Sequence, residues 1–112
     1  MLMEDPAATT SVICQELPPK EGETIVRDFA KHSAESFGNE LTYAGYKNIP
    51  ASSLLCEEDL AGPPDFQREI IAMIEQASNR KVDVTSIKAG HWPNLTAERE
   101  TIEWVLKVAK KA

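Results

Sequence analysis

The stretch "IPASSLLCEEDLAGPPDFQREIIAMIEQASNRKVDVTSIKAGHWPNL", residues 49–95, decides the fold class of this chain. Its first apolar run, "LLC" at 54–56, is short and continuous, which is typical of a strand buried on both faces. The second run, "VDVTSIKA" at 82–89, is rich in β-branched residues and indicates another strand. Between the two, "AGPP" supplies a turn and then prolines of the kind that open helices. The stretch therefore predicts a strand, a helix and a second strand, in that order.

Two amphipathic helices are expected beside these strands. The segment 64–78 carries apolar residues at helical spacing, and we expect the face that they form to be buried. The residues of this face are Phe66, Ile70, Met73, Ile74 and Ala77. The segment 97–111 is the second helix, with Thr96 as its expected N-cap, glutamates in its first turn and lysines near its end, an order that suits the helix dipole. Strands that alternate with helices predict an α/β fold whose strands are parallel, here a βαβα unit.

Residues 1–40 differ from the rest and are expected to form a helical segment. The stretches 6–17 and 19–37 each have the pattern of a short helix, and Pro18 and Pro19 separate them. "LTYAGY" at 41–46 is expected to continue in extended form to the first strand. The chain therefore divides into a helical segment, 1–40, and an α/β segment, 41–112.

Composition excludes several classes of partner and site. The 112 residues include 12 basic and 18 acidic side chains without a basic stripe, so no nucleic-acid partner is expected. No apolar run approaches the roughly 20 residues that a membrane span needs, and the first ten residues lack the pattern of a signal peptide. Cys14 and Cys56 have no metal or redox spacing, so we expect reduced, buried thiols and neither a metal nor another cofactor. These features predict a cytoplasmic protein.

The loops that follow the two strands contain the candidate functional residues. In an open parallel sheet, ligand sites form at the carboxyl ends of the strands, and these ends lead into "CEEDLAGPP" and "KAGHWPNL". If the strands are neighbours, Asp59 and His91 form a hydrogen-bonded pair at one edge of the sheet. An acid that orients a histidine is half of a nucleophilic triad. The alternatives are that Asp59 is a solvated capping residue and that His91 is structural.

Two longer stretches resemble the C-terminal half of an α/β-hydrolase. They are "YKNIPASSLLCEEDLAGPPDFQREIIAMI" and "IKAGHWPNLTAERETIEWV", and the resemblance is to esterase-like fungal and plant members, the group that includes plant methylesterases and hydroxynitrile lyases. It covers residues 41–112, while 1–40 are more loosely similar to the cap helices that precede that half. The resemblance implies that Asp59 is the triad acid, that His91 is the triad base, and that the substrate is a small carboxylic ester.

The sequence departs from this family in three ways. The family's nucleophilic serine lies in G-x-S-x-G at a strand-to-helix elbow, and no G-x-S-x-G occurs in these 112 residues. "AESFG", with Ser36, is the nearest variant and a weak nucleophile candidate, because a charged, helix-like segment precedes it. An HGGG-like oxyanion loop is also missing. Trp92 follows His91 where the lyases have a lysine, which argues against cyanohydrin chemistry and makes Trp92 a lid over the loop or a wall of the acyl pocket.

Three hypotheses follow for the function. The first is a truncated, inactive α/β-hydrolase chain, whose ester substrate would bind only if the missing half were supplied. The second is a binding or assembly module that pairs its sheet edge with another chain or with a second copy of itself, since unpaired strand edges favour association. The third is a small free-standing enzyme that uses His91, Asp59 and either Ser36 or a bound water. The missing serine elbow favours the first hypothesis over the third.

Overall fold

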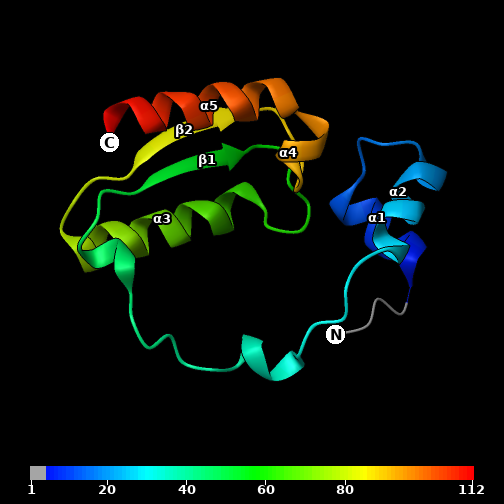
Figure 1. Ribbon diagram of the computed structural model, residues 1–112, viewed down its shortest axis with the longest axis horizontal. Helices are drawn as coiled ribbons and strands as arrows, with labels where there is room; N and C mark the ends of the chain where they lie inside the picture. The colour runs from blue at the N-terminus through cyan, green and yellow to red at the C-terminus, as the bar shows by residue number, and fades with distance from the viewer. Residues whose placement is uncertain (1–4) are drawn as a thin grey trace.

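The computed structural model describes residues 5–112 (Figure 1). The elements in chain order are α1 (Pro6–Ile13), α2 (Pro19–Arg27), the 3₁₀ turns η1 (Ala34–Phe37) and η2 (Gly45–Lys47), β1 (Ser52–Cys56), α3 (Pro64–Ser78), β2 (Asp83–Ile87), α4 (Pro93–Thr96) and α5 (Glu98–Lys111). From β1 onward the order is strand, helix, strand and helix, as the sequence predicts. Apart from the short α4, the predicted βαβα order is therefore confirmed.

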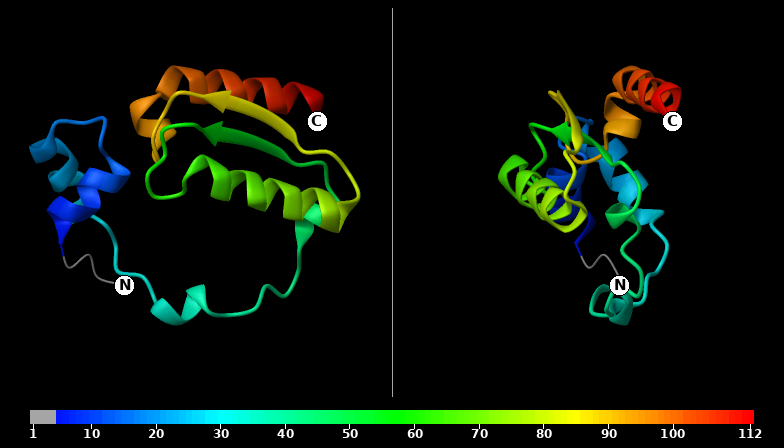
Figure 2. Two further views of the ribbon diagram at one scale, coloured as in Figure 1. Left: turned by 180° about the vertical axis from the view of Figure 1, so that it is seen from behind. Right: turned by 90° about the vertical axis from the view of Figure 1, so that its left-hand side faces the viewer.

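The two strands form a parallel sheet, which is the pairing that the sequence predicts. The register runs from Ser52 opposite Asp83 to Cys56 opposite Ile87. The pairing continues into the loops, because the N–H of Glu57 donates to the Ile87 carbonyl at 2.9 Å. Helices α3 and α5 lie on opposite sides of the strands, which the end-on view of Figure 2 shows. The chain is thus a mixed helix and strand structure built on a two-stranded parallel sheet.

The core of this structure is small. Leu55 and Cys56 are buried with 2% and 5% exposure, whereas Leu54 is only half-buried, so the strand is covered fully at its carboxyl end alone. The accessible surface of the chain is 8180 Å², while a compact monomer of this length exposes about 6,100 Å². Because the sheet has only two strands, it covers little of the helices, and much apolar surface stays exposed to solvent.

The predicted core face of α3 is wrong for most of its residues. Phe66, Ile70 and Met73 are 54%, 39% and 51% exposed, and Ala77 is exposed as well. Ile74 is half-buried as predicted, and so is Ile71, which lies outside the predicted face. Apolar residues surround more than one side of this helix, so spacing alone does not decide which side faces the sheet. The outward side of α3 remains apolar and uncovered.

The start of the last helix also differs from the prediction. Pro93 begins the short helix α4, and α5 starts only at Glu98, after Ala97 leaves helical geometry at φ −139°. Thr96 is therefore not the N-cap of α5: it ends α4, and its hydroxyl donates to the carbonyl of Trp92 at 3.1 Å. A proline placed directly after the histidine loop nucleates a separate turn, because its φ is already helical.

The N-terminal segment folds as a tight pair of helices followed by an exposed connection. Gly22 lets α2 approach α1, since a Cβ at this position would lie 2.4 Å from the side chain of Thr10. Helix α2 ends at Arg27, ten residues earlier than predicted, and residues 30–43 are all exposed. The stretch 41–46 is not an extended strand either, because η2 begins within it. No part of residues 5–112 covers this connection, so its few apolar residues cannot stabilise a longer helix or a strand by burial.

Candidate functional site

Asp59 and His91 meet at the carboxyl edge of the sheet. Asp59 lies three residues after β1 and His91 four residues after β2, and the parallel pairing brings both loops to the same end. The Nδ1 atom of His91 lies 3.0 Å from Oδ2 and 3.1 Å from Oδ1 of Asp59. The prediction that the two side chains lie within hydrogen-bonding reach is confirmed, across 32 positions of sequence.

The Asp59 carboxylate is held in place by its own loop. Its Oδ1 accepts hydrogen bonds from the N–H groups of Ala61 and Gly62, both at 2.8 Å, and its side chain is only 9% exposed. An ionised carboxylate has no proton to donate, so the hydrogen on the shared bond belongs to Nδ1 of His91. In the neutral ring this leaves Nε2 as an acceptor. The His91 side chain is 41% exposed, which keeps the ring accessible from solvent.

Gln67 fixes both ends of the Asp59 loop. Its Oε1 accepts from the N–H of Cys56 at 2.9 Å, and its Nε2 donates to the carbonyls of Cys56 at 2.9 Å and Gly62 at 2.6 Å. The N–H of Glu57 faces β2, so the backbone groups of Cys56 face the other edge of β1. The Gln67 carboxamide therefore takes the place of a neighbouring strand at that point. The sequence contains "FQ" in a proline-opened helix but does not indicate this role.

The helical pair α1 and α2 lies beside the same loops, as Figures 1 and 2 show from opposite sides. Gln15 Nε2 donates to the carbonyl of Glu58 at 2.7 Å, and the Glu16 carboxylate accepts from the N–H of Gly90. The ring of Trp92 packs edge to face on Phe29, with ring centroids 5.1 Å apart. Trp92 thus joins the histidine loop to the chain that follows α2.

Ser36 is not brought to this pair. It lies in the exposed 3₁₀ turn η1, where its hydroxyl donates to the carbonyl of Ser33 at 2.7 Å and lies 3.1 Å from Nδ1 of His32. In both views η1 belongs to the outlying connection, away from the carboxyl ends of the strands (Figures 1 and 2). It also lacks the preceding strand and following helix of a nucleophile elbow. The local geometry gives Ser36 no part in an Asp59–His91 triad.

The thiol nearest to the pair is not a substitute nucleophile. Cys56 ends β1 and is 5% exposed, and burial raises its pKa, with a further increase from the carboxylates of Asp59 and Glu16. Burial, together with the Glu16 carboxylate, also raises the pKa of Cys14. Both cysteines are free and buried, as the sequence predicts. A thiol needs a lowered pKa to react at neutral pH, so these two are suited to packing.

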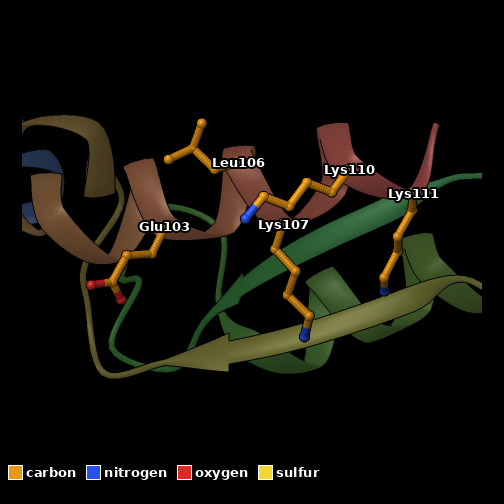
Figure 3. Close-up of a pocket in the computed structure, with 5 residues that line it drawn as sticks. All are labelled: Glu103, Leu106, Lys107, Lys110 and Lys111. Carbon is orange, nitrogen blue, oxygen red and sulfur yellow. The ribbon is translucent and has the colours of Figure 1, made fainter.

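A surface hollow runs along α5 and includes no residue of the two site loops. It has a volume of about 450 Å³ and is lined by Glu103, Leu106, Lys107, Lys110 and Lys111. Figure 3 shows Lys107 and Lys111 reaching toward β2 while Leu106 points away from it. Lys111 donates to Asp83, the first residue of β2, and this hydrogen bond lowers the pKa of the Asp83 carboxyl. The hollow is therefore separate from the loops that follow the strands.

Within residues 5–112, no three His, Cys, Asp or Glu side chains gather as a metal site requires. No helix in the same range is long and apolar enough to cross a membrane.

Comparison with known proteins gives one informative relative. The chain is 32% identical, over 90 residues, to a protein of Phoma sp. that is named "Probable hydrolase R7". The match covers 80% of this chain but 37% of the Phoma protein, so the chain spans well under half the length of that relative. No family model matches the chain, and no solved structure matches it. The name of the relative supports a link to hydrolases and specifies neither a fold family nor an ester substrate.

Proposed function

We propose that this chain is the acid and histidine part of a carboxylic-ester hydrolase of the α/β-hydrolase type. The observation that carries the proposal is the contact of His91 Nδ1 with both carboxylate oxygens of Asp59, at 3.0 and 3.1 Å. In a serine hydrolase such an aspartate orients the imidazole so that Nε2 can accept the proton of the nucleophile. The similarity to a probable hydrolase of Phoma sp. supports the same class of reaction.

The proposal assigns different roles to the two segments of the chain. Residues 41–112 are the C-terminal part of the catalytic domain, and residues 1–40 are a cap-like segment that lies against its loops. The serine and the oxyanion donors have to come from outside these 112 residues, because G-x-S-x-G and an HGGG-like loop do not occur in them. A small ester would therefore bind productively only when that other part is present.

The chain alone is expected to show no ester turnover above background. Losing one oxyanion donor already lowers the rate of an enzyme by about 10²–10³-fold, and this chain lacks the nucleophile as well. The measurement is hydrolysis of short-acyl nitrophenyl esters by the purified chain, together with labelling by a fluorophosphonate probe for activated serines. The matched variants are Ser36→Ala and His91→Ala, both of which should leave the background rate unchanged. Turnover that disappears in Ser36→Ala would contradict the proposal and support a free-standing enzyme.

A second candidate function is that of an assembly module, and the uncovered helix faces favour it. Phe66, Ile70 and Met73 are exposed on α3, and on α5 the residues Ile102 and Val105 are 50% and 51% exposed. Such apolar rows on both sides of a two-stranded sheet indicate surfaces that another chain can cover. The edges of the sheet add backbone groups that an incoming strand can pair with.

Self-association through this surface is expected at concentrations of about 10–100 μM, where interfaces with moderate free energies of binding are occupied. Light scattering as a function of concentration measures it. Met73→Lys should weaken association because it places a charge on the apolar face, whereas Ala72→Lys adds the same charge at an exposed position of α3 that points to a different side of the helix. A monomer at all concentrations, or equal effects of the two lysines, would contradict this candidate.

A further inference from the structure

The turn that follows α1 contacts both loops of the candidate site. Gln15 binds the carbonyl of Glu58, 43 positions away, and Glu16 binds the N–H of Gly90, 74 positions away. Glu58 directly precedes Asp59, and Gly90 directly precedes His91. Two adjacent side chains therefore bind the backbone immediately before each member of the pair.

The contact at Gly90 is close enough that any larger residue would displace it. Gly90 is buried, and a Cβ there would lie 2.1 Å from Oε1 of Glu16 and 2.9 Å from Nε2 of Gln15. A Cβ would push both side-chain ends away, so the contact of Glu16 with the N–H of Gly90 requires a glycine at this position. The glycine of the "AGH" loop thus has a steric reason, which lies in a segment far away in sequence.

The turn itself is anchored in the helical pair. Cys14, the residue before Gln15, is 1% exposed and closes α1 by donating its N–H to the carbonyl of Thr10 at 2.8 Å. The contact of Gly22 with Thr10 packs α2 closely onto the same helix. A side chain that extends from such a packed turn holds its partner more firmly than one on a free loop, because its backbone is already ordered.

We propose that Gln15 and Glu16 are positioning residues for the Asp59–His91 pair. Neither is hydrogen-bonded to the pair itself: Gln15 binds the loop of the acid and Glu16 binds the loop of the histidine. The N–H of Glu58 also donates to the carbonyl of Ala89 at 3.0 Å, so the turn supports two loops that their backbone already joins. This inference rests on the proposed function, in which the pair works as acid and base. It gives the segment 1–40 a defined task, which is to hold the backbone directly before Asp59 and directly before His91 in place.

The test is the exchange of two protons with solvent, measured by NMR on the full chain. They are the amide proton of Gly90, which reports the Glu16 contact, and the Nδ1 proton of His91, which reports the pair. Glu16→Ala should speed the exchange of both protons by roughly tenfold or more, because a charge-assisted hydrogen bond is lost. Glu16→Gln should restore slow exchange, since its carboxamide oxygen can still accept from Gly90. Glu40→Ala removes an exposed glutamate of the connection and should change neither proton.

These measurements distinguish the positioning role of Gln15 and Glu16 from the proposed function of the Asp59–His91 pair. An exchange rate of the His91 proton that changes less than twofold in Glu16→Ala, or a failure of Glu16→Gln to restore it, would overturn the positioning role while leaving the proposed function intact. If the ¹⁵N chemical shift of Nδ1 shows that it carries no proton in the unaltered chain, the proposed function fails, and the positioning role fails with it. If Glu16→Ala does not fold, Gln15→Ala tests the contact with the loop of the acid instead. Faster exchange of the His91 proton in this variant supports the positioning role, and unchanged exchange overturns it.

Discussion

Gln67→Ala is expected to lower the free energy of unfolding of this chain by about 2–4 kcal/mol, because a buried group that loses its partner costs about 1–3 kcal/mol. The substitution removes three hydrogen bonds at once, two to the backbone of Cys56 and one to the carbonyl of Gly62. These bonds close the outer edge of β1 and hold the Asp59 loop at both of its ends. Chemical denaturation followed by circular dichroism measures the change.

Two variants serve as controls for this prediction. Gln67→Glu keeps an acceptor for the N–H of Cys56 but loses both donated bonds and places a carboxylate against two carbonyls, so it should destabilise at least as strongly. Gln76→Ala lies at an exposed position of the same helix and should change the free energy of unfolding by less than about 0.5 kcal/mol. Equal effects of Gln67→Ala and Gln76→Ala would show that the carboxamide does not hold the loop.

Asp59→Ala is the second substitution with a large expected effect, again about 2–4 kcal/mol of unfolding free energy. It leaves the N–H groups of Ala61 and Gly62 without their acceptor and removes the partner of His91. Asp59→Asn should cost much less, because its side-chain oxygen can still accept from the same two N–H groups. The comparison, made by chemical denaturation, separates the structural role of the side chain from its effect on the histidine.

Loss of stability in Asp59→Asn as large as in Asp59→Ala would contradict this division of roles. It would mean that the charge, and not the two accepted hydrogen bonds, holds the loop. His91→Ala is the matched control at the other side of the pair: its side chain is 41% exposed, so its removal should affect the free energy of unfolding much less than the loss of Asp59.

The sequence was sufficient to predict the features that depend on local pattern. The apolar run at 54–56 lies within β1 and the β-branched run at 82–89 contains β2, and the helix between them makes parallel pairing the natural outcome. Parallel pairing then places Asp59 and His91 at one edge, since both residues follow strand ends. The pair could be predicted because its geometry follows from topology alone.

The features that depend on tertiary packing could not be predicted in the same way. Helix α3 has apolar residues on more than one side, so the choice of the buried side depends on contacts such as that of Gln67 with β1. The exposure of Phe66 follows from that choice. The role of Glu16 depends on a contact 74 positions away, for which its local sequence contains no signal. Thr96 is a residue type that often caps helices, but it ends the proline-opened helix α4, and its hydroxyl binds the carbonyl of Trp92.

If Asp59 holds His91 as a base with a free Nε2, the protonation of the two ring nitrogens will show it. We would measure the ¹⁵N chemical shifts of the His91 ring in the full chain at alkaline pH, where imidazoles are neutral. The account predicts a proton on Nδ1 and none on Nε2, and it predicts the reverse in Asp59→Asn, whose amide group would donate toward Nδ1. A proton found mainly on Nε2 of the unaltered chain, or the same tautomer in both proteins, would contradict the account.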